Sequence, residues 1–246
     1  MNIKKTVFIL ILSVVLCGCT GQVEKEKNQE VNAVIKIACV GDSITQGVGA
    51  LNWQSGDKTY AYPNQLSLIL GEGYEVGNFG KGSSYIYNKS GRDATLWYPN
   101  TEEYRLSNEF GADIVVIMLG SNDARVIYNE EEAYEWKLAF KELIKHYKEL
   151  EGEPDVYILS TLTHELYDSL KRANNPDFKL REPIIKDYIV PYQRQAAEEM
   201  NCGFIDTYSL LYELLSSGKG FASDSLHLNN LGYQELAMAV AENLDI

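Results

Sequence analysis

The chain has 246 residues, of which 45% are hydrophobic and 23% are charged, and its formal net charge is −13. This length and composition allow one globular domain of about 200 residues with a hydrophobic core. Nucleic-acid binding would need a basic surface, and adhesion to anionic lipid would need positive charge, so the acidic balance argues against both.

The N-terminal residues have the pattern of an export signal. A short basic start precedes an apolar run over residues 6–16, which is too short to span a bilayer core of about 30 Å. The tetrad that follows, Leu16-Cys17-Gly18-Cys19, resembles a bacterial lipobox, which implies cleavage before Cys19 and a lipid on its thiol. An ordinary signal peptide cut nearby and an uncleaved anchor remain alternatives.

These features divide the chain into three parts. We predict a lipoprotein signal peptide over residues 1–18, a polar tether over residues 19–33 and one folded domain over residues 34–246. The lipid would be the only attachment to the membrane, with the domain facing outward or lying in the periplasm. The sequence does not indicate an oligomeric state.

Two cysteines fall within the predicted domain, Cys39 in one predicted strand and Cys202 just before another. Neither belongs to a CxxC or Cys/His pattern that would indicate zinc, and we predict neither a metal nor a cofactor. A disulfide between the two is possible in an oxidising compartment, but their apolar context favours buried free thiols.

Short apolar runs alternate with helical patterns from residue 34 onward. The predicted strands are residues 35–40, 74–79, 113–119, 156–161 and 203–206, and the predicted helices are residues 62–70, 130–150, 182–200, 207–215 and 230–244. The third and fourth runs are continuously apolar, as expected for parallel strands covered on both faces. This order predicts an α/β fold, a three-layer α/β/α sandwich with a mainly parallel five-stranded sheet.

Four polar motifs follow strands or occupy late loops, where ligand sites of such sheets gather. They are Gly41-Asp42-Ser43, the segment NFGKGSS at residues 78–84, Gly120-Ser121-Asn122-Asp123 and Asp224-Ser225-Leu226-His227. Each motif alone is weak evidence, because short combinations of this kind arise by chance. Their joint occurrence in these places is strong evidence for one site.

The residue types in these motifs suit acyl transfer. A serine hydroxyl such as Ser43 needs a base, and the imidazole of His227 can serve near neutral pH. The base needs a partner that fixes its tautomer, and Asp224 lies one tight turn before it. Negative charge on an attacked carbonyl oxygen needs donors, which the Ser43 N–H, an N–H of the Gly82/Ser83 loop and the Asn122 amide could supply.

Other interpretations of these residues remain. Ser43 could be a helix N-cap, and Asn122 could be a turn former. His164 follows the fourth predicted strand and is a weaker candidate for the base, whereas His146 is expected to be solvated. Asp42 and Asp123 are expected to be mainly structural. The glycines do not form a dinucleotide-binding pattern, and no G-x-S-x-G elbow surrounds the serine.

Together the GDS, glycine-loop, GxND and DxxH motifs resemble the conserved blocks of SGNH (GDSL-type) hydrolases, from about residue 36 to residue 239. This resemblance implies a flavodoxin-like sheet, a catalytic triad of Ser43, Asp224 and His227, and an oxyanion hole formed by Ser43, the second motif and Asn122. The family usually has glycine where this chain has Ser83, with Gly82 just before it, so either of these two could supply the amide.

Two segments, residues 84–104 and 161–181, look similar to loops of bacterial carbohydrate and sialate O-acetylesterases in this family. The resemblance implies that the protein removes a small acyl group, with acetyl as the expected group, from a sugar or glycan. The candidate substrate contacts are Trp97, Tyr98, Arg125 and His164, although half or more of the loop aromatics are expected to pack under their own loops. Loop arginines lie on the same predicted face, and one could bind a sugar carboxylate, or all could form solvated ion pairs: Arg92, Arg125, Arg172 and Arg181.

Two other functions remain open. A lipase or lysophospholipase would need a long apolar acyl channel, for which the loops at the predicted site look too polar. A catalytically inactive glycan-binding module at the cell surface would have no need to keep all three residues of the triad.

Overall fold

A computed structural model describes residues 33–246 of the chain. The predicted signal peptide, residues 1–18, and the tether up to residue 32, including Cys19, lie outside the described residues. Within the described part, no helix is long and apolar enough to cross a membrane.

Five parallel strands form the sheet, and their carboxyl ends meet at one edge. The strands are β1 (Ile35–Gly41), β2 (Tyr74–Gly80), β3 (Ile114–Met118), β4 (Asp155–Leu159) and β5 (Gly203–Ile205). Their order in the sheet is β2-β1-β3-β4-β5, which is the flavodoxin-like order. Because Gly41 pairs with both Gly80 and Met118, the first three strands end level with one another. The predicted fold class is confirmed.

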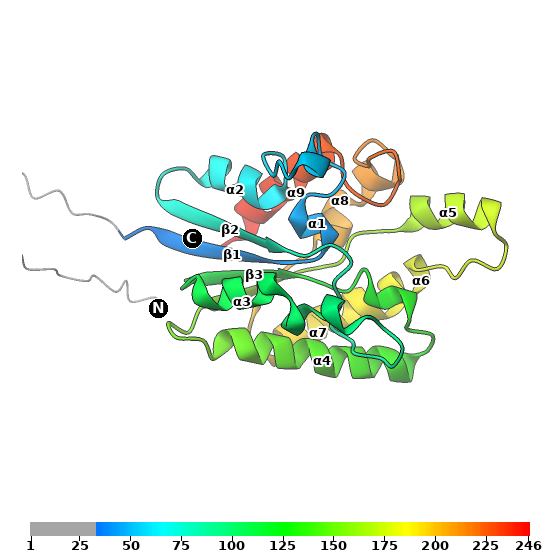
Figure 1. The fold of residues 1–246 in the computed structure, drawn as a ribbon, viewed down its shortest axis with the longest axis horizontal. Coiled ribbons are helices and arrows are strands. Elements are labelled where there is room, and N and C mark those ends of the chain that lie inside the picture. Colours follow the sequence, from blue (N-terminus) through cyan, green and yellow to red (C-terminus); the bar gives the residue numbers. More distant parts are fainter. Residues whose placement is uncertain (1–32) are drawn as a thin grey trace, which may run out of the picture. The chain divides into compact units, whose positions relative to one another are not determined.

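Helices cover both faces of this sheet (Figure 1). They are α1 (Ser43–Gln46), α2 (Tyr62–Leu70), α3 (Glu102–Glu109), α4 (Glu130–Lys148), α5 (Glu165–Asn174), α6 (Glu182–Ile184), α7 (Val190–Glu199), α8 (Thr207–Ser216) and α9 (Asn230–Asn243). Helices α2, α8 and α9 pack on one face, and α3, α4 and α7 on the other. Short 3₁₀ segments occur at Trp53–Ser55, Ala94–Leu96, Tyr98–Asn100 and Asp123–Arg125.

Strand β3 shows why the strand runs are continuously apolar. Val115 and Ile117 pack under α4 and α7, whereas Val116 and Met118 point to the opposite layer with α2 and α9. Both faces are therefore buried, and every position of the strand is apolar. The sequence predicts an apolar stripe on the helix over residues 130–150, of which five members are buried and Leu150, beyond the end of α4, is half-buried: Trp136, Phe140, Leu143, Ile144, Tyr147 and Leu150.

The helices differ from the prediction in several places, and α1 and α3 were not predicted at all. The predicted helix over residues 182–200 is divided into α6, a π-helical turn at Ile185–Ile189, and α7. Pro191 has no N–H and would crowd the preceding carbonyl of a regular α-helix, and the wider π turn accommodates it. Helix α5 lies within the segment 161–181, which was expected to be a loop. Its only buried residue is Asp168, so it has no buried apolar stripe to mark it.

The two cysteines of the described part are unpaired. Cys39 is buried with the α2 and α9 layer, whereas Cys202 is half-buried against the opposite layer. The sheet therefore separates the two thiols. The expectation of free thiols agrees with this placement, although only Cys39 is fully buried.

Candidate active site

The first motif places a serine at the start of α1, directly after β1. Asp42 caps this short helix, and its carboxylate accepts the N–H of Ile44 at 2.9 Å. The capping role considered for Ser43 thus belongs to Asp42, and the Ser43 hydroxyl is left free for another partner. That partner is His227, whose Nε2 lies 3.0 Å from the Ser43 Oγ.

The last motif holds the histidine through its own aspartate. His227 Nδ1 lies 2.6 Å from one carboxylate oxygen of Asp224, and the other oxygen accepts the N–H groups of Leu226 and His227 at 2.9 Å each. Partial burial alone would raise the pKa of Asp224, but these hydrogen bonds outweigh it and the pKa lies below its ordinary value. An ionised carboxylate at Nδ1 favours the tautomer in which Nε2 can accept a proton from Ser43.

A close contact between two loops brings the serine and the histidine together. Gly49 lies after α1, and a Cβ on it would come within 2.8 Å of the His227 Cβ and 2.7 Å of the Leu228 carbonyl oxygen. Tyr233 of α9 secures the same loop by donating its hydroxyl to the Val48 carbonyl at 2.6 Å. The distance between Ser43 and His227 therefore depends on glycine at position 49.

The second motif forms a tight turn beside α1. Ser84 N–H donates to the Lys81 carbonyl at 3.1 Å, and Ser83 at the third position of the turn has a φ of +64°. This left-handed conformation favours glycine. Among the described residues, the N–H groups of Ser43, Gly82 and Ser83 have no hydrogen-bond acceptor. Gly82 lies close to α1, since a Cβ there would meet the Gln46 side-chain oxygen at 2.7 Å.

The third motif brings an amide to the same place. Asn122 Nδ2 donates to the Ser84 carbonyl at 3.0 Å, and its other contact, to the Asp42 carboxylate, is long at 3.5 Å. One amide proton is therefore committed and the other is only weakly engaged. Burial raises the pKa of Asp42 to about 7, although its hydrogen bond from Ile44 partly offsets this effect.

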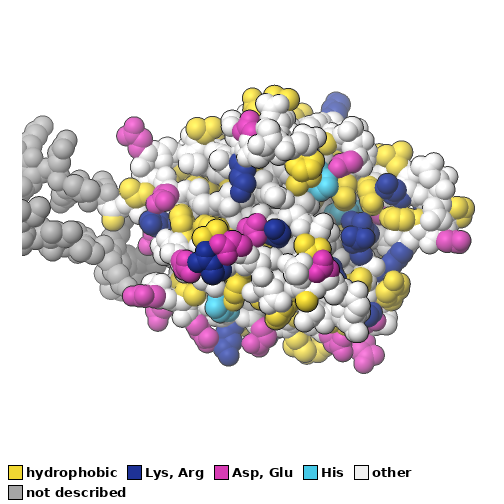
Figure 2. All heavy atoms as spheres, viewed as in Figure 1, with side chains coloured by type: hydrophobic (Ala, Val, Ile, Leu, Met, Phe, Trp, Pro, Cys, Tyr) yellow, Lys and Arg dark blue, Asp and Glu magenta, His cyan; other side chains and the backbone are white. Residues whose placement is uncertain are grey.

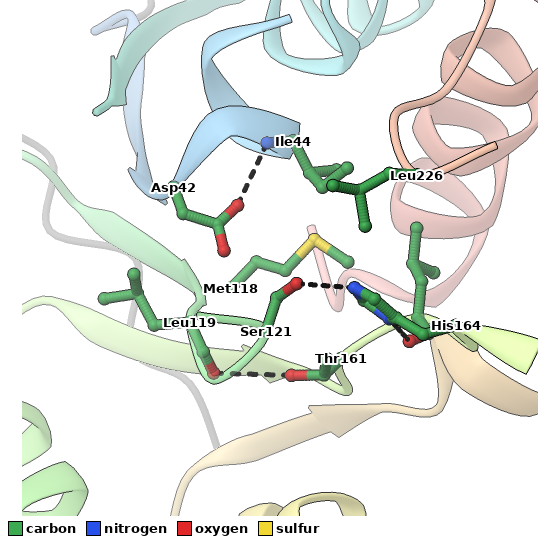
Figure 3. A pocket seen from close by; sticks show the side chains of 9 residues that line it. Asp42, Ile44, Met118, Leu119, Ser121, Thr161, His164 and Leu226 are labelled. Carbon is green, nitrogen blue, oxygen red and sulfur yellow. Dashed lines mark hydrogen bonds between the residues drawn. The ribbon is translucent and has the colours of Figure 1, made fainter. Parts of the chain in front are cut away.

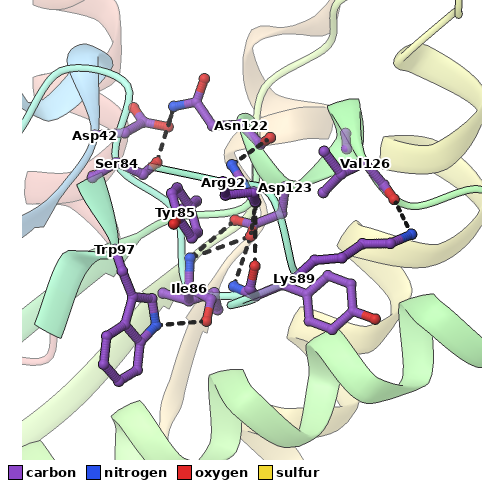
Figure 4. Close-up of polar contacts among 12 residues, drawn as sticks. Asp42, Ser84, Tyr85, Ile86, Lys89, Arg92, Trp97, Asn122, Asp123 and Val126 are labelled. Atoms are coloured by element: carbon purple, nitrogen blue, oxygen red, sulfur yellow. Dashed lines mark hydrogen bonds and ion pairs between the residues drawn. The ribbon is translucent and has the colours of Figure 1, made fainter. Parts of the chain in front are cut away.

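A buried ion pair between Asp123 and Arg92 lies next to Asn122 and contacts its backbone (Figure 4). The carboxylate of Asp123 is fully buried and accepts the backbone N–H groups of Ile86 and Tyr87. Arg92 contacts this carboxylate at 3.3 Å, donates to the Asn122 carbonyl at 3.2 Å and lies 3.3 Å from the centre of the Tyr85 ring. Asp123 thus has the structural role that was expected. Arg92 links the Asp123 carboxylate to the backbone carbonyl of Asn122 by contacting both.

A small cavity lies among residues that follow or precede the candidate site residues in the chain (Figure 3). Ile44, the neighbour of Ser43, and Leu226, the neighbour of His227, line it together with residues from the ends of β3 and β4: Asp42, Met118, Leu119, Ser121, Thr161, Leu162 and His164. Its volume of about 10 Å³ is room for roughly one water molecule. The sequence analysis did not predict this cavity, although the positions of Ile44 and Leu226 beside triad residues were a signal.

His164 lies in the cavity wall and cannot replace His227 as the base. It is buried, its Nδ1 faces the Leu162 carbonyl at 3.1 Å, and its Nε2 faces the Ser121 hydroxyl at 2.9 Å. Burial, with a further contribution from the charge of Arg181, lowers its pKa to about 3. A ring that binds a proton so weakly is a poor base, so the candidate role that remains for His164 is to line the site.

The structure places the other predicted substrate-contact residues in different surroundings. Tyr98 does not line the site: it is fully buried in the core, and its hydroxyl donates to the Phe79 carbonyl at 2.7 Å, so the prediction that it contacts substrate is wrong. Trp97 is half-buried, and its indole N–H donates to the Ile86 carbonyl at 3.0 Å. Arg125 is exposed, three residues after Asn122. His146 is half-buried rather than solvated, next to Asn108 and remote from the four motifs.

Comparison with known proteins identifies the family of this chain. The model of the GDSL-like lipase/acylhydrolase family matches residues 39–235. The chain belongs to this family. The matched region of this GDSL protein runs from within β1 to within α9 and includes all four motifs.

Individual relatives of the GDSL protein differ in their described activities. The acetylxylan esterase of Xylanibacter ruminicola is 28% identical over 215 residues, which are 84% of this chain but only 42% of that protein. A structure of a carbohydrate acetylesterase family member from Sinorhizobium meliloti has a TM-score of 0.62 and 20% identity, covering 85% of this chain and 96% of its own. The aryl esterase of M. smegmatis has a TM-score of 0.65 and 19% identity, with coverages of 85% and 97%. At such identities the two structures show a shared fold.

Proposed function

We propose that the protein is a serine esterase that removes small acyl groups from sugars or glycans, with acetyl as the preferred group. The observation that carries this proposal is the hydrogen-bonded series from Ser43 Oγ to His227 Nε2 and from His227 Nδ1 to Asp224. It lies at the carboxyl edge of the sheet, beside amide donors that have no partner among the described residues.

The geometry supports an acyl-enzyme mechanism. His227 accepts the proton of Ser43 while the hydroxyl oxygen attacks the ester carbonyl, and Asp224 stabilises the imidazolium that forms. The N–H of Ser43, one N–H of the Gly82–Ser83 turn and the Asn122 amide would bind the oxyanion. His227 then gives the proton to the leaving sugar oxygen, and water activated by the same imidazole releases the carboxylic acid.

The small cavity favours a short acyl group. Its lining residues Ile44 and Leu226 flank the nucleophile and the base, so the acyl chain of a bound ester would point toward it. A space that holds roughly one water molecule matches a methyl group and not a long chain. The X. ruminicola acetylxylan esterase and the S. meliloti carbohydrate acetylesterase family member support the same substrate class, whereas a lipase would need a longer channel.

Replacing the nucleophile tests the mechanism. Ser43→Ala should lower kcat/KM for 4-nitrophenyl acetate by at least about 10³-fold, because no other group is placed to form the acyl-enzyme. Ser169→Ala, which removes an exposed hydroxyl on α5, serves as the matched control and should keep full activity. Undiminished turnover by the Ser43 variant with native thermal unfolding would disprove the assignment, and it would favour the glycan-binding alternative if the parent protein is also inactive.

Acyl-chain preference separates the esterase from the lipase alternative. We expect 4-nitrophenyl acetate to be cleaved faster than the octanoate ester, because the cavity lined by Ile44 and Leu226 has room for roughly one water molecule. Leu226→Ala should widen the cavity and raise the octanoate-to-acetate ratio. A parent protein that prefers octanoate would support the lipase alternative.

We also propose that the protein is exported and anchored by lipid on Cys19, on the basis of the lipobox-like tetrad. The full chain expressed in a bacterium should incorporate labelled palmitate, and Cys19→Ala should abolish the label. Cys202→Ala, which changes a cysteine of the folded domain, should retain it. Equal labelling of the parent and the Cys19 variant would contradict the proposal.

A further inference from the structure

Arg181 is a buried cation without a partner beside the candidate active site. Only 7% of its surface is exposed, and its guanidinium carbon lies 5.0 Å from the centre of the Tyr167 ring. Within residues 33–246 its guanidinium makes no ion pair and no hydrogen bond; its hydrogen bonds are those of its backbone, from its N–H to Asp168 and from the Ile185 N–H to its carbonyl. Buried charges are normally paired, so this side chain has an unused capacity to bind an anion.

The guanidinium of Arg181 remains accessible. None of its nitrogen atoms is among the fully enclosed polar atoms that lack a partner, so each keeps some contact with solvent. Its neighbour in the chain, Glu182, accepts the backbone N–H of His164, which lines the small cavity. Arg181 is also close enough to His164 and Asp42 for its charge to affect the pKa of both.

Arg125 belongs to a different element, the 3₁₀ segment Asp123–Arg125, and lies near Arg181. It ends the 3₁₀ segment that follows Asn122, and side chains three positions apart lie on the same side of such a segment. Arg125 is exposed and, like Arg181, forms no ion pair within the described residues. The two side chains lie near enough that the charge of Arg125 adds to the effect of burial in lowering the pKa of Arg181.

Carboxylates lie near these arginines without forming an ion pair with them. Asp123 is paired with Arg92, whereas one oxygen of Asp168 accepts two backbone N–H groups and the other has no hydrogen-bond partner among the described residues. The charges of Asp168 and Arg181 affect each other's pKa, so Asp168 offsets part of the charge of Arg181. Burial raises the pKa of Asp42 to about 7, which reduces its negative charge near neutral pH. In Figure 2, several Lys and Arg side chains lie on the right of the face near His side chains, while Asp and Glu side chains are spread over the face and along its lower rim. A chain with a net charge of −13 therefore keeps unpaired positive charge near the site.

We infer that Arg125 and Arg181 form a subsite for the carboxylate of an acidic sugar, so that the preferred substrate is an acetylated glycan unit that carries a carboxylate. This inference rests on the proposed esterase function. An acidic protein repels anionic substrates at long range, and a local pair of guanidinium groups offsets that repulsion. The planar guanidinium also matches the geometry of a carboxylate.

The test compares two substrates that differ only in charge. Acetate release is measured from mono-O-acetylated methyl glucuronosides, taken as a mixture of positional isomers, and from the corresponding C6 carboxamides. We expect kcat/KM of the parent protein to favour the carboxylate by about tenfold or more, as a charge-assisted contact predicts. Arg125→Gln and Arg181→Gln should each bring this ratio toward one and leave 4-nitrophenyl acetate hydrolysis within about threefold.

The matched control is Arg105→Gln, which removes the same charge from an exposed position on α3, and it should keep the ratio. Arg125 is exposed, so its variant is expected to fold even if the Arg181 variant does not. A ratio near one in the parent protein, an equal loss on both sugars in the Arg125 variant, or a similar loss in the Arg105 variant would overturn the inference. If Ser43-dependent cleavage of 4-nitrophenyl acetate is present without a carboxylate preference, only this inference fails; if that cleavage is absent, the esterase proposal fails and this inference falls with it.

Discussion

Ser83 has a backbone conformation that glycine adopts at lower cost, in the tight turn beside α1. Its φ of +64° lies in the left-handed region that favours glycine, the residue that the family resemblance predicts at this point of the motif. The departure noted in the sequence is therefore a local strain in the backbone, and the turn is formed in spite of it.

Relief of this strain can be measured. Ser83→Gly should raise the free energy of unfolding by up to about 1 kcal/mol, because the relief of the left-handed conformation exceeds the added entropy of the unfolded chain. Urea denaturation would measure the change. Ser169→Gly, in the middle of α5, should have the opposite sign, since helical glycine is unfavourable. Destabilisation by Ser83→Gly would show that the serine side chain contributes more than the strain costs.

At the scale of elements, the contact between the loop after α1 and the loop before α9 sets the catalytic distance. Gly49→Ala would bring a Cβ within 2.8 Å of the His227 Cβ, so the histidine has to move. We expect kcat/KM for 4-nitrophenyl acetate to fall about tenfold or more, because small displacements of a base are costly to catalysis.

Gly56 provides the control for this change. Its φ of +82° is similar to the +93° of Gly49, but a Cβ there would meet nothing within 4 Å. Gly56→Ala should therefore cause a similar backbone strain and leave activity unchanged. If the two variants lose activity equally, the strain and not the contact with His227 is responsible.

The sequence predicted the elements that have a buried apolar pattern and missed those that do not. Continuous or periodic apolar residues predicted the five strands and α4. The motifs at strand ends predicted that Ser43, Asn122 and His227 belong to one site. Helix α5 buries no apolar stripe, so composition could not reveal it. Tyr98 looked like a substrate contact because it lies in an aromatic loop, yet the fold buries it and gives its hydroxyl a backbone partner. The small cavity depends on how side chains from several elements pack, which a motif does not encode.

For the whole molecule, the neutral state of His164 links stability to pH. Its pKa is about 3 in the folded protein but 6.5 when unperturbed, so between these values the unfolded chain binds one proton more. The contribution of His164 to the free energy of unfolding should therefore decrease as pH falls below 6.5. This contribution falls by about 2 kcal/mol between pH 7 and pH 5.

Comparison with His164→Asn isolates this contribution. Asp42 acts in the opposite direction, because its pKa is raised from 3.8 to about 7 and its stabilising contribution is lost as pH rises through that range. This effect is common to the parent and the variant and largely cancels in their difference. Urea unfolding at pH 7 and pH 5 should show a shallower loss for His164→Asn, and a smaller change for His146→Asn, whose ring is only half-buried. Parallel losses in the parent and the His164 variant would contradict the assignment of His164 as a buried neutral ring.

The bend from Gly220 to Asn229 carries both Asp224 and His227 of the proposed triad. Its backbone hydrogen bonds, from Ala222 N–H to the His227 carbonyl and from Asn229 N–H to the Gly220 carbonyl, hold the bend together. Any loosening of this bend would move the imidazole and its carboxylate away from the serine together, without breaking the bond between them. Loss of activity on mild heating would then follow from separation of this bend from α1, and activity would return on cooling where the sheet has stayed folded.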